Sequence, residues 1–245
     1  MSMLANLSTD SSVTEEKDSV GSSGPLDSGL YKASVVLAYV VKSAGGAMGL
    51  KLTLKTDAGR EIRQTLWMTS GTAKGCKNYY EKDGEKFYLP GFNHANSLAL
   101  LTCGKEISSM DTETKVVNEY SAEAKAEVPT KVEMLMDLLG KEIIVGLIRQ
   151  TVDKTKKNDS TGIYEPTGET RDENEIDKLF RAKDRMTTAE IRAQAETAVF
   201  IDTWDTKNSG KTRMKSKGVS GTPGAPKAAG ATAVAAKKPT TSLFA

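Results

Sequence analysis

The chain has 245 residues, of which 27% are charged and 38% hydrophobic. This length is enough for a sizeable core, either in one domain with unstructured ends or in two small domains. No apolar run approaches the roughly 20 residues that span a bilayer, so we expect no membrane association. The first 29 residues lack the basic start and apolar centre of a signal peptide, and we therefore expect no export.

Charge is distributed unevenly along the chain, although the net charge is only +2. Residues 1–29 contain one lysine and five acidic residues, whereas residues 207–245 contain eight cations and no acidic residue. An acidic arm and a basic tail around a nearly neutral body indicate binding to a polyanion, with the arm competing for the same surface. The two cysteines form no disulfide framework and fit a reducing compartment.

The predicted structure begins near residue 30. Residues 1–29 are rich in serine, glycine and acidic residues, so they bury too little apolar surface to offset the entropy of ordering. We expect them to be disordered. From Leu30 the pattern predicts a strand over 30–42 that is apolar on both sides in its middle. One face of this strand is expected to carry Tyr31, Ala33, Val35, Leu37, Tyr39 and Val41.

Two alternating strands follow over 48–68, joined by a turn at 57–59. The apolar face of the pair carries Met48, Leu50, Leu52, Leu54, Ile62, Leu66 and Met68. The other face carries lysines, an arginine and an out-of-place tryptophan, Trp67. A loop rich in cations and aromatic residues comes next, over 74–88.

The rest of the chain alternates helices, strands and loops. A strand over 141–154 contains Gly146, which indicates a bulge or sharp bend of the kind found at barrel corners. Thr187 and Glu190 form a capping-box pattern that opens a helix through about Ala198. The other expected elements are a turn at 89–92, a helix at 93–104, a strand at 115–120, a strand or short helix at 132–139, a polar loop at 154–168, an extended segment at 170–180 and a flexible tail at 207–245.

The polar face of the strand pair and the loop after it interleave cations with aromatic side chains. This composition suits a single nucleic-acid strand, because charge holds phosphates while flat rings stack on unpaired bases. The predicted phosphate contacts are Lys51, Lys55, Arg60, Arg63, Lys74, Lys77, Lys82 and Lys86. The predicted stacking residues are Trp67, Tyr79, Tyr80 and Tyr88.

Each part of this surface also has a simpler structural explanation. Trp67 fits a ring that is covered by another layer of the fold, and the loop aromatics fit rings that pin a long loop to the body. Exposed lysines most often form a solvated face. The nucleic-acid interpretation is favoured by the shared location of these residues on one face and its adjoining loop.

Catalytic and metal chemistry find little support in the residues. The single histidine, His94, disfavours histidine-based catalysis, and it makes no zinc-binding spacing with Cys76 and Cys103. Lys211 lies in a sequence that imitates the end of a phosphate-binding P-loop, but the upstream glycine of that motif is absent. We therefore predict no catalytic residues, no metal site and no cofactor. The acidic cluster at 172–177 leaves a Mg²⁺-dependent nuclease as an alternative.

Five segments together suggest a family. They are YKASVVLAYV (31–40), QTLWMTSG (64–71), KNYYEKDGEKFYLPGFNHANSLALLTCGKE (77–106), VEMLMDLLGKEIIVGLIRQTVDKTKKNDSTG (132–162) and ETRDENEIDKLF (169–180). Through them the body of the chain resembles the single-stranded DNA-binding proteins of tailed bacteriophages, especially the podovirus type. The resemblance implies a five-stranded oligonucleotide/oligosaccharide-binding (OB) barrel with extra elements that binds single strands without catalysis. The curved alternating strands, long basic loops and basic-aromatic face favour the same fold independently.

The predicted fold is therefore mainly β, an OB-like barrel with a few short helices and disordered N- and C-terminal tails. We divide the chain into an acidic arm (1–29), an OB-like domain that binds single-stranded DNA (30–206) and a basic tail (207–245). The predicted function is to coat and protect single-stranded DNA during replication or recombination, in the cytoplasm of a phage-infected bacterial cell. Expected partners are single-stranded DNA and either replication proteins or an RNA polymerase, with cooperative or oligomeric assembly on DNA.

One feature departs from the family pattern. Proteins of this kind typically end in an acidic tail, often with a terminal aromatic residue that recruits replication partners. Here the tail is basic and Phe244 is penultimate. The alternative function is a transcription factor that binds single-stranded DNA and recruits an RNA polymerase to opened promoters. Its docking element would be the apolar tip at Leu243 and Phe244 or the acidic arm.

We predict that the basic tail adds affinity for DNA, because its eight cations neutralise phosphates and release counterions. Deleting residues 207–245 is expected to weaken binding to a single-stranded oligonucleotide at low salt. An unchanged affinity at low salt, measured by titration, would contradict this role for the tail.

Overall fold

The structure is a computed structural model that describes residue 12 and residues 24–121, 124–158 and 164–216. It is mainly β, which confirms the predicted class. The chain divides into two compact units, Met1–Thr151 with Asp172–Met214 and Val152–Arg171 with Lys215–Ala245. Within the described segments, no helix combines the length and the apolar character needed to cross a bilayer.

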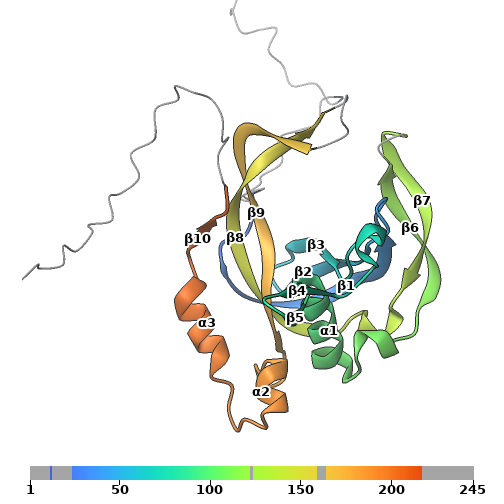
Figure 1. Cartoon of the computed structure of the whole chain (residues 1–245). Coiled ribbons are helices and arrows are strands. Elements are labelled where there is room, and N and C mark those ends of the chain that lie inside the picture. The colour runs from blue at the N-terminus through green and yellow to red at the C-terminus, as the bar shows by residue number, and fades with distance from the viewer. Residues whose placement is uncertain (1–11, 13–23, 122–123, 159–163, 217–245) are drawn as a thin grey trace, which may run out of the picture. The chain divides into compact units, whose positions relative to one another are not determined.

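Figure 1 labels the helices and strands. The strands are β1 (Gly29–Lys42), β2 (Met48–Thr56), β3 (Glu61–Trp67), β4 (Tyr79–Lys82), β5 (Glu85–Tyr88), β6 (Glu113–Ser121), β7 (Ala126–Met134), β8 (Glu142–Lys157), β9 (Tyr164–Arg181) and β10 (Thr212–Met214). The α-helices are α1 (Pro90–Cys103), α2 (Thr188–Arg192) and α3 (Phe200–Asn208). Short 3-10 helices are η1 (Thr72–Lys74), η2 (Ile107–Ser109) and η3 (Met136–Leu138).

The main sheet has the strand order β10-β8-β1-β2-β3, with β9 paired to β8 and the β6–β7 hairpin paired to β1 through β7. Hairpin β4–β5 forms a separate two-stranded sheet. Among the described residues, no backbone ladder joins β3 to β9, so the sheet is open. A side-chain hydrogen bond connects the two strands, in which the backbone N–H of Ile176 in β9 donates to Gln64 Oε1 of β3 at 2.8 Å.

Strand β1 is the strand on which the main sheet is built. It pairs antiparallel with β2 from Ala33 to Lys42. Its other edge pairs with β8 over Gly29–Ser34 and with β7 at Tyr39 and Val40. One long strand therefore serves two neighbours in succession on the same edge.

A bulge in β1 separates these two pairings. Val35 pairs with Leu54 and Leu37 pairs with Thr53, so Val36 is an extra residue and is 41% exposed. Because side chains alternate along a strand, one extra residue reverses the two faces beyond it. The prediction that residues 31 to 41 keep a single alternation is therefore wrong after Val35.

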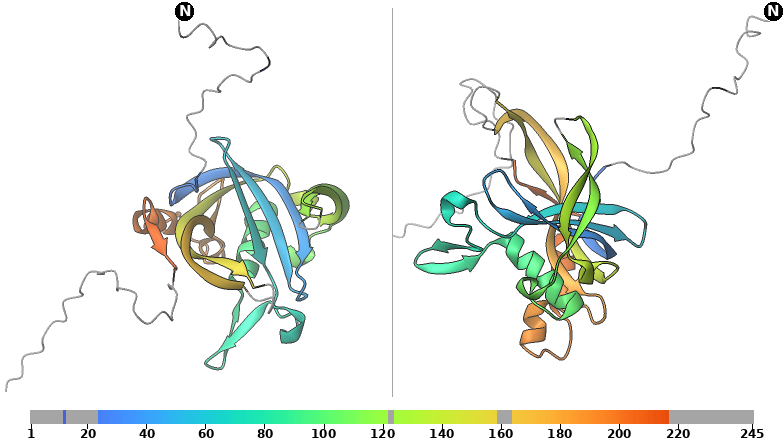
Figure 2. Two further views of the ribbon diagram at one scale, coloured as in Figure 1. Left: turned by 90° about the horizontal axis from the view of Figure 1, so that it is seen from above. Right: turned by 90° about the vertical axis from the view of Figure 1, so that its right-hand side faces the viewer.

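The main core fills the space between the apolar face of β1–β2–β3 and helix α1 (Figure 2). After the bulge Ala38 turns into this core, whereas Tyr39 packs into a separate cluster with Val132 and Met134 of β7. The predicted apolar face of β2 and β3 is confirmed for Leu50, Leu52, Leu54, Ile62 and Leu66, which are all buried. Met48, at the start of β2, was assigned to the same face but is 44% exposed.

A second core lies on the opposite face of β8. Ile143, Val145 and Leu147 point into the main core, whereas Ile148 packs with Phe180, Ile201 and Trp204. This confirms the predicted alternation of the strand. Gly146, however, marks no bulge, since it pairs with Leu30 in continuous register. A Cβ there would lie 2.9 Å from Trp204 Cζ2, so the glycine is required by the close approach of the tryptophan ring.

Three other predicted elements have different bounds. α1 begins at Pro90 rather than at residue 93. Proline is well tolerated at the first position of a helix, because the N–H that it lacks would have no partner within the helix there. It ends at the predicted Gly104, which adopts φ 70°. The segment 132–139 is the end of β7 followed by η3, and α2 ends at Arg192 although its capping box at Thr187 is confirmed.

The described part of the second unit consists mainly of the last residues of β8, from Val152, and the first residues of β9, up to Arg171. Lys154 Nζ lies 2.8 Å from Glu169 Oε2, and the Thr167 hydroxyl donates to the Lys154 carbonyl at 3.2 Å. The polar loop predicted at 154–168 is therefore wrong, because strand pairing continues through residues that are polar on both faces. No apolar alternation marks such a strand in the sequence.

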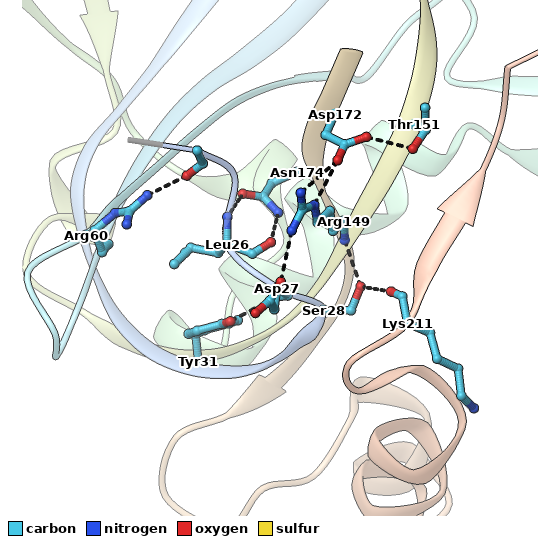
Figure 3. Close-up of polar contacts among 11 residues, drawn as sticks. Leu26, Asp27, Ser28, Tyr31, Arg60, Arg149, Thr151, Asp172, Asn174 and Lys211 are labelled. Atoms are coloured by element: carbon cyan, nitrogen blue, oxygen red, sulfur yellow. Dashed lines mark hydrogen bonds and ion pairs between the residues drawn. The ribbon is translucent and has the colours of Figure 1, made fainter. Parts of the chain in front are cut away.

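The acidic arm was predicted to extend too far into the chain. Leu26 exchanges two hydrogen bonds with the Asn174 side chain, at 2.8 and 2.7 Å (Figure 3). Ser28 Oγ accepts from Arg149 N at 2.8 Å and donates to the carbonyl of Lys211. Arg60 Nη2 donates to the Gly24 carbonyl at 2.7 Å. Residues 24–28 are thus held against the β2–β3 turn, β8 and β9.

The basic tail was likewise predicted to begin too early. α3 continues to Asn208, and β10 pairs in parallel with β8 at Arg149, Gln150 and Thr151. A deletion that tests the tail alone therefore begins after Ser216. Residues 217–245, with the apolar tip at 243–244, lie outside the described residues, as do residues 1–11 and 13–23 of the arm.

The bulge makes a prediction about stability. Ala38 is fully buried, so Ala38→Leu is expected to destabilise the protein by about 1–3 kcal/mol through overpacking, measured by urea unfolding. The matched change Val36→Leu is expected to cost little, because Val36 is exposed. If both changes were equally tolerated, Ala38 would not face the core and the bulge would be misplaced.

Candidate nucleic-acid interface

The polar face of β2 and β3 is set by the burial of the other face. Because Leu50, Leu52 and Leu54 are fully buried, the residues between them point away from the main core. Trp67 shares this face and is 44% exposed. Its ring lies beside Gly49, where a Cβ would be 2.9 Å from Trp67 Cε3. In the described structure, therefore, Trp67 rests on the sheet and is not enclosed by another layer.

Several cations of this face already have partners. Lys51 Nζ lies 2.9 Å from Glu119 Oε1 of β6 and 5.6 Å from the centre of the Tyr39 ring. Arg63 Nη2 lies 2.6 Å from Glu61 Oε2. A phosphate would have to compete with these carboxylates, so the two residues are weaker phosphate contacts than the sequence suggests. Lys55 is exposed at the far end of β2.

The Lys51 pair belongs to a small polar cluster with Tyr39. Burial opposes ionisation of Glu119, but hydrogen bonds from Tyr39 and Lys51 outweigh it and lower the pKa of the carboxyl. Burial and the bond to Glu119 raise the pKa of the Tyr39 phenol, which therefore stays protonated near neutral pH. The cluster fixes the β6–β7 hairpin to the polar face of the sheet.

The loop after Trp67 is fixed at its base by backbone contacts. Thr72 N donates to the Gly45 carbonyl at 2.8 Å, and Leu89 N donates to the Asn78 carbonyl at 2.9 Å. A Cβ at Gly91 would lie 2.2 Å from the Trp67 carbonyl O, so the start of α1 runs directly against the end of β3. These contacts place the loop next to Trp67.

Most of the predicted loop is the β4–β5 hairpin, which extends outward beside the start of α1 (Figure 2). Its turn is Asp83-Gly84, with φ of 53° and 82°. An Asp-Gly pair with positive φ at both positions matches the right-handed twist of the two strands. This dipeptide was the signal in the sequence that would have identified the hairpin.

The hairpin sorts its aromatic residues onto two faces. Tyr79 pairs with Tyr88, and Tyr80 pairs with Phe87 on the opposite face. The Tyr80 and Phe87 rings are stacked, with centroids 5.7 Å apart. Tyr88 meets Phe92 of α1 at 5.0 Å. Sequence reasoning did not assign Phe87 and Phe92 to the site.

Cations lie directly against one of these rings. Lys77 Nζ and Lys86 Nζ are 5.4 and 5.0 Å from the centre of the Tyr79 ring. Tyr80 and Tyr88 are 46% and 56% exposed. The hairpin therefore presents open rings and lysines together, and these two rings do not serve mainly to pin the loop to the body.

The structure brings the predicted residues together in two groups. The hairpin group lies close to Trp67 and contains Lys74, Lys77, Tyr79, Tyr80, Lys82, Lys86 and Tyr88. The sheet group contains Lys51, Lys55, Arg60 and Arg63. Arg60 precedes β3 and lies roughly 20 Å along the strand from Trp67, at about 3.3 Å per residue. A ligand that touches both groups must therefore be an extended chain.

The acidic run at 172–177 has structural partners. Asp172 Oδ2 lies 2.8 Å from Arg149 Nη2, and the Thr151 hydroxyl donates to Asp172 Oδ1 at 2.6 Å. Asp177 accepts hydrogen bonds from Trp204 Nε1 at 2.7 Å and from Arg213 at 3.0 Å. The described segments contain no cluster of three or more metal-ligating side chains. These acids join β8, β9, β10 and α3, so their pattern has a structural explanation.

His94 is half-buried near the start of α1, and its Nε2 lies 3.0 Å from the Asp177 carbonyl O. Desolvation lowers the pKa of the imidazole, which is therefore neutral at pH 7. The contact with Asp177 ties α1 to β9, so the histidine has a structural role.

Comparison with known proteins adds no further assignment. No protein-family model matches the chain, and no curated protein matches it significantly.

The two tryptophans are expected to differ sharply in acrylamide quenching. Trp67 is 44% exposed, whereas Trp204 is 4% exposed and hydrogen-bonded to Asp177. The variant Trp67→Phe, which retains only Trp204, should emit at shorter wavelength and resist quenching. Trp204→Phe should retain the strongly quenched signal. Equal quenching of the two variants would contradict the exposure of Trp67.

Proposed function

We propose that this protein is a non-catalytic single-stranded DNA-binding protein of a bacteriophage, which coats and protects unpaired strands during replication or recombination. The observation that carries the proposal is the neighbourhood of Trp67. An exposed indole on the polar sheet face stands next to a hairpin that presents open rings and lysines. Rings stack on unpaired bases of any sequence, while lysines hold the backbone between them.

An OB-like fold is part of the proposal. The strands β1, β2 and β3, followed by α1 and the β8–β9 pair, have the order of a five-stranded OB barrel with a helix after its third strand. The bond between Gln64 and Ile176 supports closure between β3 and β9. OB folds bind oligonucleotides on the face of their second and third strands, and here that face carries Lys51, Arg63 and Trp67.

The biological setting follows from the resemblance alone. We propose that the protein acts in the cytoplasm of the infected bacterial cell and assembles cooperatively on DNA, with replication proteins or an RNA polymerase as partners. The docking elements of the transcription-factor alternative lie outside the described residues. No feature within the described ranges favours that alternative over a role in replication.

Binding is tested by the fluorescence of Trp67 during titration with a poly-dT oligonucleotide and, separately, with a duplex of equal length. We expect strong quenching by the single strand only. Trp67→Ala lacks this signal, so its affinity is measured by the fluorescence anisotropy of a labelled oligonucleotide. The change is expected to weaken binding by about 1–3 kcal/mol, because it removes a stacking face. Lys55→Ala is expected to weaken binding less and to reduce the slope of log affinity against log salt by about 0.7.

The control for folding is the urea unfolding curve of each variant. Normal DNA binding by Trp67→Ala would show that the sheet face is not the stacking site. The absence of any DNA binding by the wild-type protein would reject the proposed function.

A further inference from the structure

A cleft of about 900 Å³ lies between the β4–β5 hairpin, α1, the end of β9, α2 and the first residue of α3. All of these elements belong to the first unit. The hairpin contributes Tyr80, Lys86, Phe87 and Tyr88 to its wall. The volume is within the range of about 300–1,000 Å³ that is typical of small-ligand sites. It therefore has room for a nucleobase with its sugar and phosphate.

Aromatic rings line the cleft from the β4–β5 hairpin, from α1 and from α3. On the hairpin, the stacked Tyr80 and Phe87 are 46% and 40% exposed. From α3, Phe200 is also 40% exposed and packs at 6.4 Å against the buried Phe180. A ring that is held on one side and open on the other offers a ready stacking surface, because it needs no rearrangement to accept a base.

Cations from β5, β9 and α2 accompany the rings. Lys178 Nζ lies 5.6 Å from the centre of the Phe200 ring, and Lys86 and Arg192 also line the cleft. Two acidic residues, Glu106 and Glu190, also line the cleft. The Glu190 carboxylate accepts backbone hydrogen bonds from Thr187, Val199 and Phe200 at 2.8 to 2.9 Å. These bonds outweigh burial and lower the pKa of the carboxyl. Its negative charge is therefore already compensated within the fold.

We propose that this cleft is a second binding subsite, in which a nucleotide of the bound single strand stacks on Phe200 or on the Tyr80–Phe87 pair. Lys178 and Arg192 would hold its phosphates. The inference rests on the proposed function and extends it beyond the sheet face and the Tyr79 side of the hairpin. A nucleotide fits better than an apolar peptide, because the cleft is lined by three cations, Lys86, Lys178 and Arg192, together with its aromatic rings.

The test uses the full chain, with Trp67 quenching by poly-dT oligonucleotides of increasing length as the readout. Phe200→Leu keeps apolar packing on Phe180 and removes the stacking face, and Val199→Ala is its exposed neighbour outside the cleft. We expect Phe200→Leu to weaken binding of the longer oligonucleotides about 5- to 100-fold. Val199→Ala should leave it unchanged.

A second pair of variants tests the charge. Lys178→Ala removes a cation from the cleft, and Lys183→Ala removes another exposed cation just after β9, outside the cleft. We expect Lys178→Ala to weaken binding about two- to fivefold and Lys183→Ala to have no measurable effect. Unfolding curves of all four variants control for stability.

Photocrosslinking of the wild-type protein keeps the proposal testable if Phe200→Leu fails to fold. An oligonucleotide with 5-iodouracil in place of thymine is irradiated in the complex, and the crosslinked peptides are mapped. Crosslinks to Tyr80, Phe87 or Phe200 would support the subsite. Crosslinks confined to the Trp67 region, with all four variants binding normally, would overturn the subsite while the proposed function stands. If the wild-type protein binds no single-stranded DNA, the proposed function fails and the subsite fails with it.

Discussion

The bulge at Val36 is the constraint on which the arrangement of the sheet depends. A strand of regular alternation would keep one face toward one core along its whole length. With one extra residue, β1 directs Ala33 and Val35 into the main core before the bulge and Ala38 into the same core after it. Tyr39 is thereby turned to the other side, where β7 covers it. The same strand thus supports β8 at its start and the β6–β7 hairpin at its end.

This division of β1 also shapes the candidate interface. The β6–β7 hairpin reaches the polar face of β2, where Glu119 forms an ion pair with Lys51. This structural contact neutralises part of the positive charge of the face. At the other end of the face, Trp67 leads into the β4–β5 hairpin and is held by the close approach of Gly49 and Gly91. The surface with the strongest binding character is therefore the region around Trp67 and the hairpin, rather than the whole strand pair.

Charge in the remainder of the described structure serves mainly to join elements. Arg149 of β8 forms ion pairs with Asp27, which lies just before β1, and with Asp172 of β9 (Figure 3). Three parts of the chain therefore meet at one guanidinium. Arg213 of β10 pairs with Asp177, which also receives the indole N–H of Trp204. These contacts explain why an acidic run that resembles a metal-binding cluster in the sequence is part of a framework. They also join β10 to β8, β9 and α3.

The sequence by itself determined the strand class, the buried face of β2 and β3, the two-sided alternation of β8 and the cap at Thr187, because each depends on the period of apolar residues or on a local hydrogen bond. It also brought the cations and rings of 74–88 together, since they are neighbours in the chain. Tertiary structure alone decided the rest. The bulge in β1 reverses the two faces of the strand, but a strand that is apolar on both sides carries no sequence signal for it. Gly146 is required by the ring of Trp204, which is 58 positions away in the sequence. The same holds for three other features: the polar β8–β9 hairpin, the partners of the acids at 172–177 and the cleft beside Phe200. Each depends on contacts between residues that are separated in the sequence, and a local pattern of apolar residues does not predict such contacts.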